Sequence, residues 1–158
     1  MTAPSATARS APGGIALKEG FSTKITLASD PDISFWEKDV QPSAYDGGDP
    51  IDISTMHNTT YRTKAPRSLV DVGAVQSKVA YDPAVITQIM SIINVSTTIT
   101  VTHPDGSTEA AYGYLRSFTR DAHADGAQPE GTIVLEITNY DSTANVEAGP
   151  TITSVAGT

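Results

Sequence analysis

The chain has 158 residues, a net charge of −8 at neutral pH and no cysteine, which excludes disulfides, thiolate metal sites and a thiol nucleophile. It contains 21 Thr and 15 Ser but only 6% aromatic residues, and such a composition favours strands with β-branched hydroxyl side chains on an exposed face. The length suits one domain with one core. The acidic charge argues against a protein that grips nucleic acid through its phosphates.

The first segments predict a flexible end followed by two strands. Residues 1–14 are rich in Ala, Ser, Thr, Pro and Gly and are typical of a flexible N-terminal arm. They lack the apolar stretch of a secretory signal, and no stretch of the chain reads as a membrane anchor. Residues 21–28 alternate, with Phe21, Ile25 and Leu27 on one face, which predicts a half-buried strand. A second strand is expected over 33–40, and it carries the only tryptophan, Trp36.

A long irregular loop is predicted over residues 41–68, and loops of this length are commonly functional or ordered by a partner. Acidic and basic residues around this loop lie in separate segments. Residues 30–52 carry seven acids and one base, whereas residues 60–80 carry four bases and one acid. One interpretation is two solvated surfaces. The other is self-complementarity, in which the acidic loop of one copy meets the basic segment of the next.

Residues 83–94 carry the clearest helix signal. Asp82 can cap this helix and Pro83 suits its first position, while Asn94 is a plausible stop. The isoleucines of its apolar stripe, together with Met90, are expected to fill the core rather than to form a cofactor pocket.

The C-terminal half predicts a hairpin, a further strand and a tail. Residues 96–102 and 108–119 flank a HisProAspGly turn, and Tyr112, Tyr114, Arg116 and Phe118 are expected to share one face of the second strand. A strand follows over 132–140, and the tail 141–158 holds a possible short strand at 151–155. We therefore expect a mainly β fold over 15–140, an antiparallel β-sandwich or open barrel with one flanking helix.

The sequence offers little chemistry for catalysis. His57, His103 and His123 lack metal-ligand spacing, and no nucleophile elbow or phosphate-binding glycine loop is present. The acids of residues 46–52 could resemble a calcium loop, but the two adjacent glycines favour a sharp turn. We predict that the chain is not an enzyme and carries no cofactor or metal.

Several stretches, in their order along the chain, resemble the major tail tube proteins of long-tailed bacteriophages. The main ones are FWEKDVQPSAYDGGDPID at 35–52, TMHN at 55–58, RTKAPRSL at 62–69 and YDPA at 81–84. Shorter pieces follow at HPDGS 103–107, YGYL 112–115 and TN 138–139. The similarity runs over most of residues 20–150.

The resemblance implies a virion protein that assembles in the host cytoplasm into stacked hexameric rings. The rings would form the tail tube, through which the genome is ejected, and DNA would pass without specific binding. Other partners would be the tape-measure, tail-terminator and baseplate proteins. Loop 41–68 would act as an inter-subunit joint, with an opposing basic surface and a lumen wall elsewhere. The joint residues are Tyr45, Asp46, Gly47, Gly48, Asp49, Pro50, Ile51 and Asp52; the opposing basic residues are Arg62, Lys64 and Arg67; the lumen candidates are Glu109 and Glu136.

Other functions remain open on the sequence alone. The same type of fold would serve a secretion-system tube, a tail terminator or a baseplate ring. An extracellular carbohydrate-binding β-module would need a platform of exposed aromatic side chains, and one Trp, six Tyr and three Phe supply few. A hydrolase is the remaining alternative.

Overall fold

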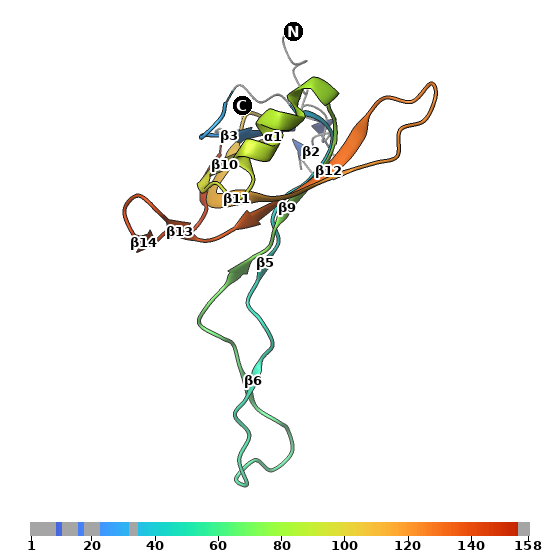
Figure 1. The fold of residues 1–158 in the computed structure, drawn as a ribbon. Helices are drawn as coiled ribbons and strands as arrows, with labels where there is room; N and C mark the ends of the chain where they lie inside the picture. Colours follow the sequence, from blue (N-terminus) through green and yellow to red (C-terminus); the bar gives the residue numbers. More distant parts are fainter. Residues whose placement is uncertain (1–8, 11–15, 18–22, 32–34, 155–158) are drawn as a thin grey trace.

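A computed structural model describes residues 9–10, 16–17, 23–31 and 35–154 of the chain. Its centre is one antiparallel sheet with the strand order β3-β10-β11-β12-β9-β4, to which β15 adds beside β11 (Figure 1). The strands of this sheet are β3 (Lys24–Leu27), β4 (Trp36–Gln41), β9 (Val75–Ala80), β10 (Thr97–Thr102), β11 (Thr108–Arg120), β12 (Glu130–Ile137) and β15 (Thr151–Thr153).

Four two-stranded pieces and one helix complete the described fold. Helix α1 (Ile86–Ile92) follows a 3-10 turn, η1 (Pro83–Val85), and lies across one side of the sheet (Figure 1). A mainly β, antiparallel architecture with one flanking helix confirms the predicted fold class. The short strands pair as β1 (Arg9–Ser10) with β2 (Ala16–Leu17), β5 (Tyr45–Asp46) with β8 (Asp71–Val72), β6 (Ile51–Asp52) with β7 (Lys64–Ala65), and β13 (Tyr140–Asp141) with β14 (Val146–Glu147).

The core lies between the helix and the sheet face that holds the alternating apolar residues. In β3, Ile25 and Leu27 are buried as predicted, and β12 alternates strictly between buried and half-buried positions. From the helix, Ile89 and Ile92 join the same cluster. The remaining buried members are Phe35, Val72, Val75, Val79, Ile99, Val101, Ala111, Leu115, Ile133, Leu135 and Ile137. The opposite face of the sheet, which we call the helix-free face, carries many hydroxyl side chains together with Lys24, Lys78 and Glu136.

A β-bulge at Arg116 divides β11 into two halves. Before the bulge the odd-numbered residues face the core, and after it the even-numbered residues do. Leu115 is opposite Leu135, but Ser117 is opposite Val134, so one extra residue is inserted between them. Beyond the bulge Phe118 lies opposite Ile133 and packs against the core. The expectation that Phe118 shares a face with Tyr112 and Tyr114 is therefore wrong, because a bulge shifts the alternation by one residue.

The helix predicted over 83–94 forms in two parts, the 3-10 turn η1 and the shorter helix α1. The Asp82 carboxylate caps η1 by accepting a hydrogen bond from the Ala84 amide at 2.9 Å, and Asn94 adopts a left-handed φ of 63° after the last turn of α1. Met90 is 66% exposed, so its predicted place in the core is wrong. With only seven α-helical residues, the buried stripe is limited to Ile89 and Ile92.

One carboxylate joins β3 and β4, the first and last strands in the order of the main sheet. Glu37 of β4 accepts a hydrogen bond from the Ile25 amide of β3 at 2.9 Å, so its side chain stands where a strand-to-strand hydrogen bond would close the sheet. Burial raises the pKa of Glu37 above its ordinary value of 4.5, although the hydrogen bonds to backbone amides and Lys24 act in the opposite direction.

We expect Glu37→Gln to raise the free energy of unfolding at pH 7, because the amide keeps an acceptor for the Ile25 amide without a buried charge. In the wild type the folded state holds the proton more tightly than the unfolded state. Its stability therefore falls as pH rises from 4.5 through the raised pKa. Urea unfolding across this window should show a weaker fall in the Gln variant, and an unchanged pH dependence would contradict the assignment. Glu37→Ala, which leaves the Ile25 amide unpaired, should lower stability by about 1–3 kcal/mol.

The predicted ends of the chain are only partly described. Phe21, most of segment 1–14 and residues 155–158 lie outside the described residues, as do residues 33–34 of the second predicted strand. Within the predicted tail, β15 forms on β11, with Ile152 opposite Glu109. The region after residue 140 therefore contributes to the main sheet. No helix in the described part of the chain is long and apolar enough to cross a membrane.

Candidate assembly interface

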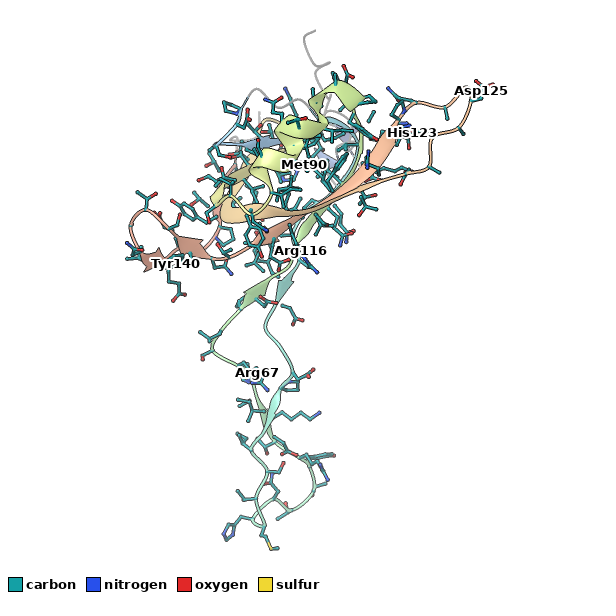
Figure 2. All side chains as sticks on the ribbon, in the orientation of Figure 1. Arg67, Met90, Arg116, His123, Asp125 and Tyr140 are labelled. Atoms are coloured by element: carbon teal, nitrogen blue, oxygen red, sulfur yellow. The ribbon has the colours of Figure 1, made fainter. Side chains whose placement is uncertain are left out.

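Residues 42–74, here called the long hairpin, project far from the body between β4 and β9 (Figures 1 and 2). Near the body β5 pairs with β8, and farther out β6 pairs with β7. The loop predicted as irregular over 41–68 is thus two paired limbs, and its returning limb continues past residue 68. Each pairing is only two residues long, which explains why no strand pattern marks it in the sequence.

The base of the long hairpin is fastened to β11. The Gly73 amide donates to the Ala44 carbonyl at 2.7 Å, and Ser43 Oγ donates to Glu109 at 2.9 Å. The Tyr45 hydroxyl also donates to Glu109, and burial together with this carboxylate raises the Tyr45 pKa above its usual value. Opposite Tyr45, Val72 enters the core. The hairpin therefore leaves the body in a fixed direction.

The middle of the hairpin is held by the run of glycines and aspartates singled out in the sequence. Asp46 Oδ1 accepts from the Gly48 amide at 2.8 Å, and Gly48 has a φ of +76°. The chain bends here but continues outward from β5 to β6, so the sharp reversal predicted at the two glycines is wrong. A Cβ at Gly48 would lie 3.0 Å from Arg67 Cδ, while Arg67 Nε donates to the Asp49 carbonyl at 2.8 Å. Arg67 thus crosses the two limbs directly over Gly48 (Figure 2).

The tip, residues 53–63, is ordered by one asparagine. Asn58 Oδ1 accepts from the Thr55 amide, and its Nδ2 donates to the Tyr61 carbonyl and to Thr63 Oγ1, all within 2.8–2.9 Å. Thr63 is also joined to Ser54, whose Oγ accepts from the Thr63 amide at 2.7 Å. The tip therefore has a defined shape without any apolar core of its own.

The predicted basic surface lies on the same hairpin as the acids. Arg62 forms an ion pair with Asp52 at 3.4 Å, and Lys64 is directly opposite Asp52 in the ladder. Hydrogen bonds from Ser54 and Arg62 hold the Asp52 pKa below its usual range. Residues 45–52 form the outgoing limb, and Arg62, Lys64 and Arg67 form the returning limb. The opposite charges therefore lie next to each other within one chain. The sequence-based prediction places the basic residues on a separate, opposing surface.

The hairpin also exposes large apolar side chains that charge arguments did not identify. Met56 is fully exposed and Tyr61 is 83% exposed, both at the tip. An isolated two-stranded hairpin is marginally stable in water, and exposed apolar clusters on an ordered element commonly mark an interaction surface. The other exposed members are Tyr45, Ile51, Ile53, Leu69 and Val70. In the sequence the only sign of this cluster is a set of apolar residues without strand or helix period.

The two lumen candidates lie on opposite faces of the sheet. Glu109 is opposite Val101, which is buried, so it faces the core side and the base of the long hairpin. Glu136 is opposite Tyr114 on the helix-free face and forms an ion pair with Arg116 at 3.3 Å. The two glutamates therefore cannot line one common surface. Alternation places Thr98, Thr100, Thr102, Tyr112 and Thr132 on the face of Glu136.

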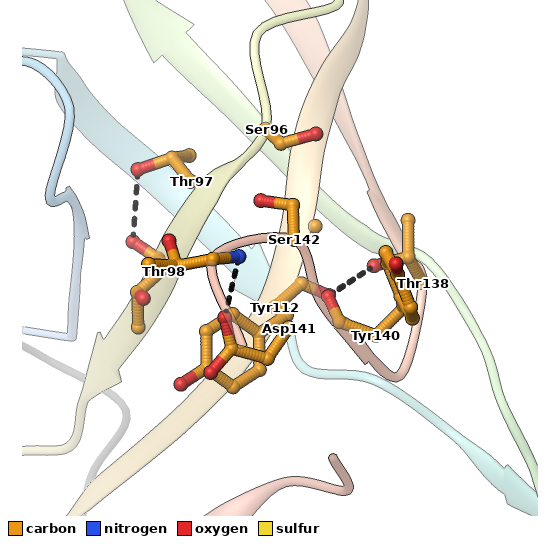
Figure 3. A pocket seen from close by; sticks show the side chains of 10 residues that line it. Ser96, Thr97, Thr98, Tyr112, Thr138, Tyr140, Asp141 and Ser142 are labelled. Atoms are coloured by element: carbon orange, nitrogen blue, oxygen red, sulfur yellow. Dashed lines mark hydrogen bonds between the residues drawn. The ribbon is translucent and has the colours of Figure 1, made fainter. Parts of the chain in front are cut away.

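A small hydroxyl-lined pocket lies where the β13–β14 hairpin meets β10 and β11 (Figure 3). Its volume is about 80 Å³, and Ser96, Thr97 and Ser142 line it. Asp141 accepts from the Thr143 amide at 2.9 Å and raises the pKa of Tyr112 through its negative charge. These contacts hold the β13–β14 hairpin on the sheet, and they present no nucleophile with an adjacent base.

The histidines and exposed aromatic residues are dispersed. His57 is at the tip, His103 is in the β10–β11 turn, and His123 Nε2 lies 3.0 Å from the Tyr81 hydroxyl. In the part of the chain that the structure describes, no three His, Asp or Glu residues gather as metal ligands. The exposed aromatics Trp36, Tyr45, Tyr61 and Tyr140 belong to different elements, an arrangement unlike a carbohydrate-binding platform.

The fold has a counterpart among solved structures. The sequence matches no protein-family profile and no curated protein. A chain in the structure titled "Cryo-EM structure of the anti-feeding prophage (AFP) baseplate, 6-fold symmetrised" superimposes with a TM-score of 0.53 at 8% identity. The match covers 73% of this chain and 87% of that chain. At this identity the likeness concerns the fold.

Proposed function

We propose that this chain is a structural component of a phage-like tail or baseplate, in which copies contact one another through the long hairpin. The observation that carries the proposal is the hairpin itself. It is tied to the body at Glu109 and ordered at its tip by Asn58, yet it leaves Met56 and Tyr61 in solvent. Such an element gains stability when it docks on another molecule. The fold shared with a chain from a prophage baseplate supports the same setting.

More specifically, we propose a tail tube subunit that forms stacked hexameric rings. A hairpin that projects from one end of a subunit suits a head-to-tail contact, and such contacts generate open tubes when they do not close. The helix-free face, with its threonines, Tyr112, Tyr114 and Glu136, is our candidate for the lumen. The same register places Lys24 and Lys78 on this face, but Lys78 is paired with Glu130 and Asp121, and Arg116 is paired with Glu136. A hydroxyl-rich wall whose cations are offset by carboxylates would let DNA pass without binding its phosphates strongly. Glu109 is no longer a lumen candidate.

The proposed role is mechanical rather than catalytic. The polar groups described above satisfy turns, caps and strand contacts, as Asp46, Asn58 and Asp82 illustrate. The virion, with assembly in the host cytoplasm, is the location that follows from this role, and the tape-measure, tail-terminator and baseplate proteins would be its partners.

Electron microscopy of the purified full-length protein tests the proposal. At rising protein concentration we expect rings about 100 Å wide, the rough size of six such domains around a channel, and tubes made of stacked rings. Sedimentation velocity on the same samples should show loss of monomer in favour of large species. A protein that stays monomeric at every concentration would contradict the proposal.

A baseplate ring is the second candidate, because a structural counterpart comes from a baseplate. The same images distinguish the two functions. Tubes of indefinite length support the tail tube, whereas single or paired rings that do not stack further support a baseplate or terminator ring.

A further inference from the structure

The tip of the long hairpin has one apolar and one basic feature that its own chain leaves uncovered. Met56 and Tyr61 extend into solvent. Lys64, just below the tip, is exposed and forms no ion pair with the described residues, whereas Arg62 lies near Asp52. A surface that covers this tip should therefore offer apolar contact together with acidic groups.

A groove with these properties lies on the body. Trp36, Tyr81, Asp82, Pro83, Gln128 and Pro129 line it, and its volume is about 350 Å³. That is far more than the roughly 30 Å³ that one water occupies, so it can admit side chains. Trp36, the only tryptophan of the chain, lies on the wall of this groove and is 57% exposed. The lining of the groove is more apolar than polar, and the groove lies open to solvent.

One wall of the groove is held in place by contacts within the body. Tyr81 is buried and packs edge-on against Phe118, with ring centres 5.1 Å apart. Its amide donates to the Pro129 carbonyl at 3.2 Å, which joins the end of β9 to the start of β12. Asp82 is fixed as the helix cap. A preorganised groove binds without the entropic penalty of ordering its own walls.

The groove and the long hairpin lie at opposite ends of the same pair of strands. Trp36 is opposite Ala80 in the β4–β9 ladder, and the hairpin leaves from the other end, after Gln41 and before Val75. Six residues of extended chain separate the two ends by roughly 20 Å. A second copy placed below in the same orientation would bring its groove toward the first copy's tip, which is a heterologous contact.

Charge agrees with this pairing. Near the groove, Lys78 lies 3.2 Å from Glu130 and 3.4 Å from Asp121, so these carboxylates already have partners. Asp82 in the groove forms no ion pair with the described residues. It is available to Lys64 of an incoming tip.

We propose that this groove receives the hairpin tip of a second copy of this chain, with Met56 and Tyr61 packed against Trp36, Pro83 and Pro129. The inference rests on the proposed self-assembly and adds the receiving surface. Methionine against an aromatic ring and Tyr against proline are favourable contacts of the kind that dominate interfaces.

The single tryptophan makes the groove directly observable. On assembly we expect Trp36 emission to shift to shorter wavelength and to resist quenching by acrylamide, because docking removes water from its ring. A Met56→Ser/Tyr61→Ser variant should keep monomer-like emission and require about thirtyfold or more protein to assemble. Met90→Ser, which changes an exposed methionine on α1, is the matched control and should behave as wild type. Assembly with unchanged Trp36 emission would overturn the inference.

A cysteine pair gives a second test, since the wild-type chain has no thiol. Protein carrying Met56→Cys is mixed with protein carrying Gln128→Cys, assembled and oxidised. We expect a disulfide-linked dimer, and none when Met90→Cys replaces Gln128→Cys. Assemblies seen by electron microscopy without this cross-link would refute the groove while leaving the proposed function intact. The absence of any assembly would refute both. Trp36 already shielded in the monomer would show that the chain's own residues fill the groove, which also overturns the inference.

Discussion

Replacing residues 46–71 by Asn-Gly is expected to leave a folded protein that no longer forms rings or tubes. Tyr45 and Val72 are directly opposite in the β5–β8 ladder, so a two-residue turn can join them without moving the base. Val72 and the contacts of Ser43 and Tyr45 with Glu109 are retained. The core therefore survives, whereas the tip and the exposed apolar side chains beyond Tyr45 are removed.

Circular dichroism and thermal unfolding should show a body close to wild type, and sedimentation velocity should show monomer at concentrations at which wild type assembles. The matched control shortens another exposed hairpin: residues 142–145, between β13 and β14, are replaced by Asn-Gly and assembly should persist. Normal tubes from the variant that lacks residues 46–71 would refute the role of the long hairpin.

Gly113→Ala is expected to destabilise the body by about 3 kcal/mol or more, which is a large share of a domain's 5–15 kcal/mol. Gly113 lies in β11 between β10 and β12, opposite Thr97 and Ile137. A Cβ there would overlap the Glu136 carbonyl oxygen and lie 2.8 Å from Ile99 Cδ1. A backbone oxygen in the centre of a sheet cannot move aside as a flexible side chain can, so strands must separate.

For a chain of this length the melting temperature should fall by roughly 6–12 °C. Gly47→Ala is the matched control, because a Cβ at Gly47 meets no atom within 4 Å and should change the melting temperature little. A Gly113→Ala protein that melts within about 2 °C of wild type would contradict the close approach of β11 and β12.

Much of the body follows from local sequence. The alternation of Ile25 with Leu27, and of Ile133 with Leu135, predicts both strands because one buried face imposes a period of two. Asp82 marks the start of the helical segment because its carboxylate caps the Ala84 amide, and Asn94 marks the end because it adopts a left-handed φ there. These features depend on neighbours a few residues apart, which a sequence displays directly.

The interface depends on contacts that the sequence does not display. Pairings of two residues, such as Asp52 with Lys64, are too short for any period, so the long hairpin reads as a loop. The bulge at Arg116 also leaves no clear sign in the sequence, because Leu115 and Phe118 are apolar whether or not the alternation shifts between them. The exposure of Met56 and Tyr61 depends on the whole fold, because it is decided by whether distant segments of the chain pack over these side chains.

The two ladders of the long hairpin are separated by unpaired residues on both limbs, at 47–50 and at 66–70. Arg67, which donates to the Asp49 carbonyl, bridges this gap. A hairpin built in this way is stiff at the two ladders and more flexible between them. In a filament whose subunits are joined by such hairpins, bending would occur in the hairpins between the bodies, and each body would keep its shape. Bending stiffness would then depend on the side chains that cross the gap, with Arg67 first among them.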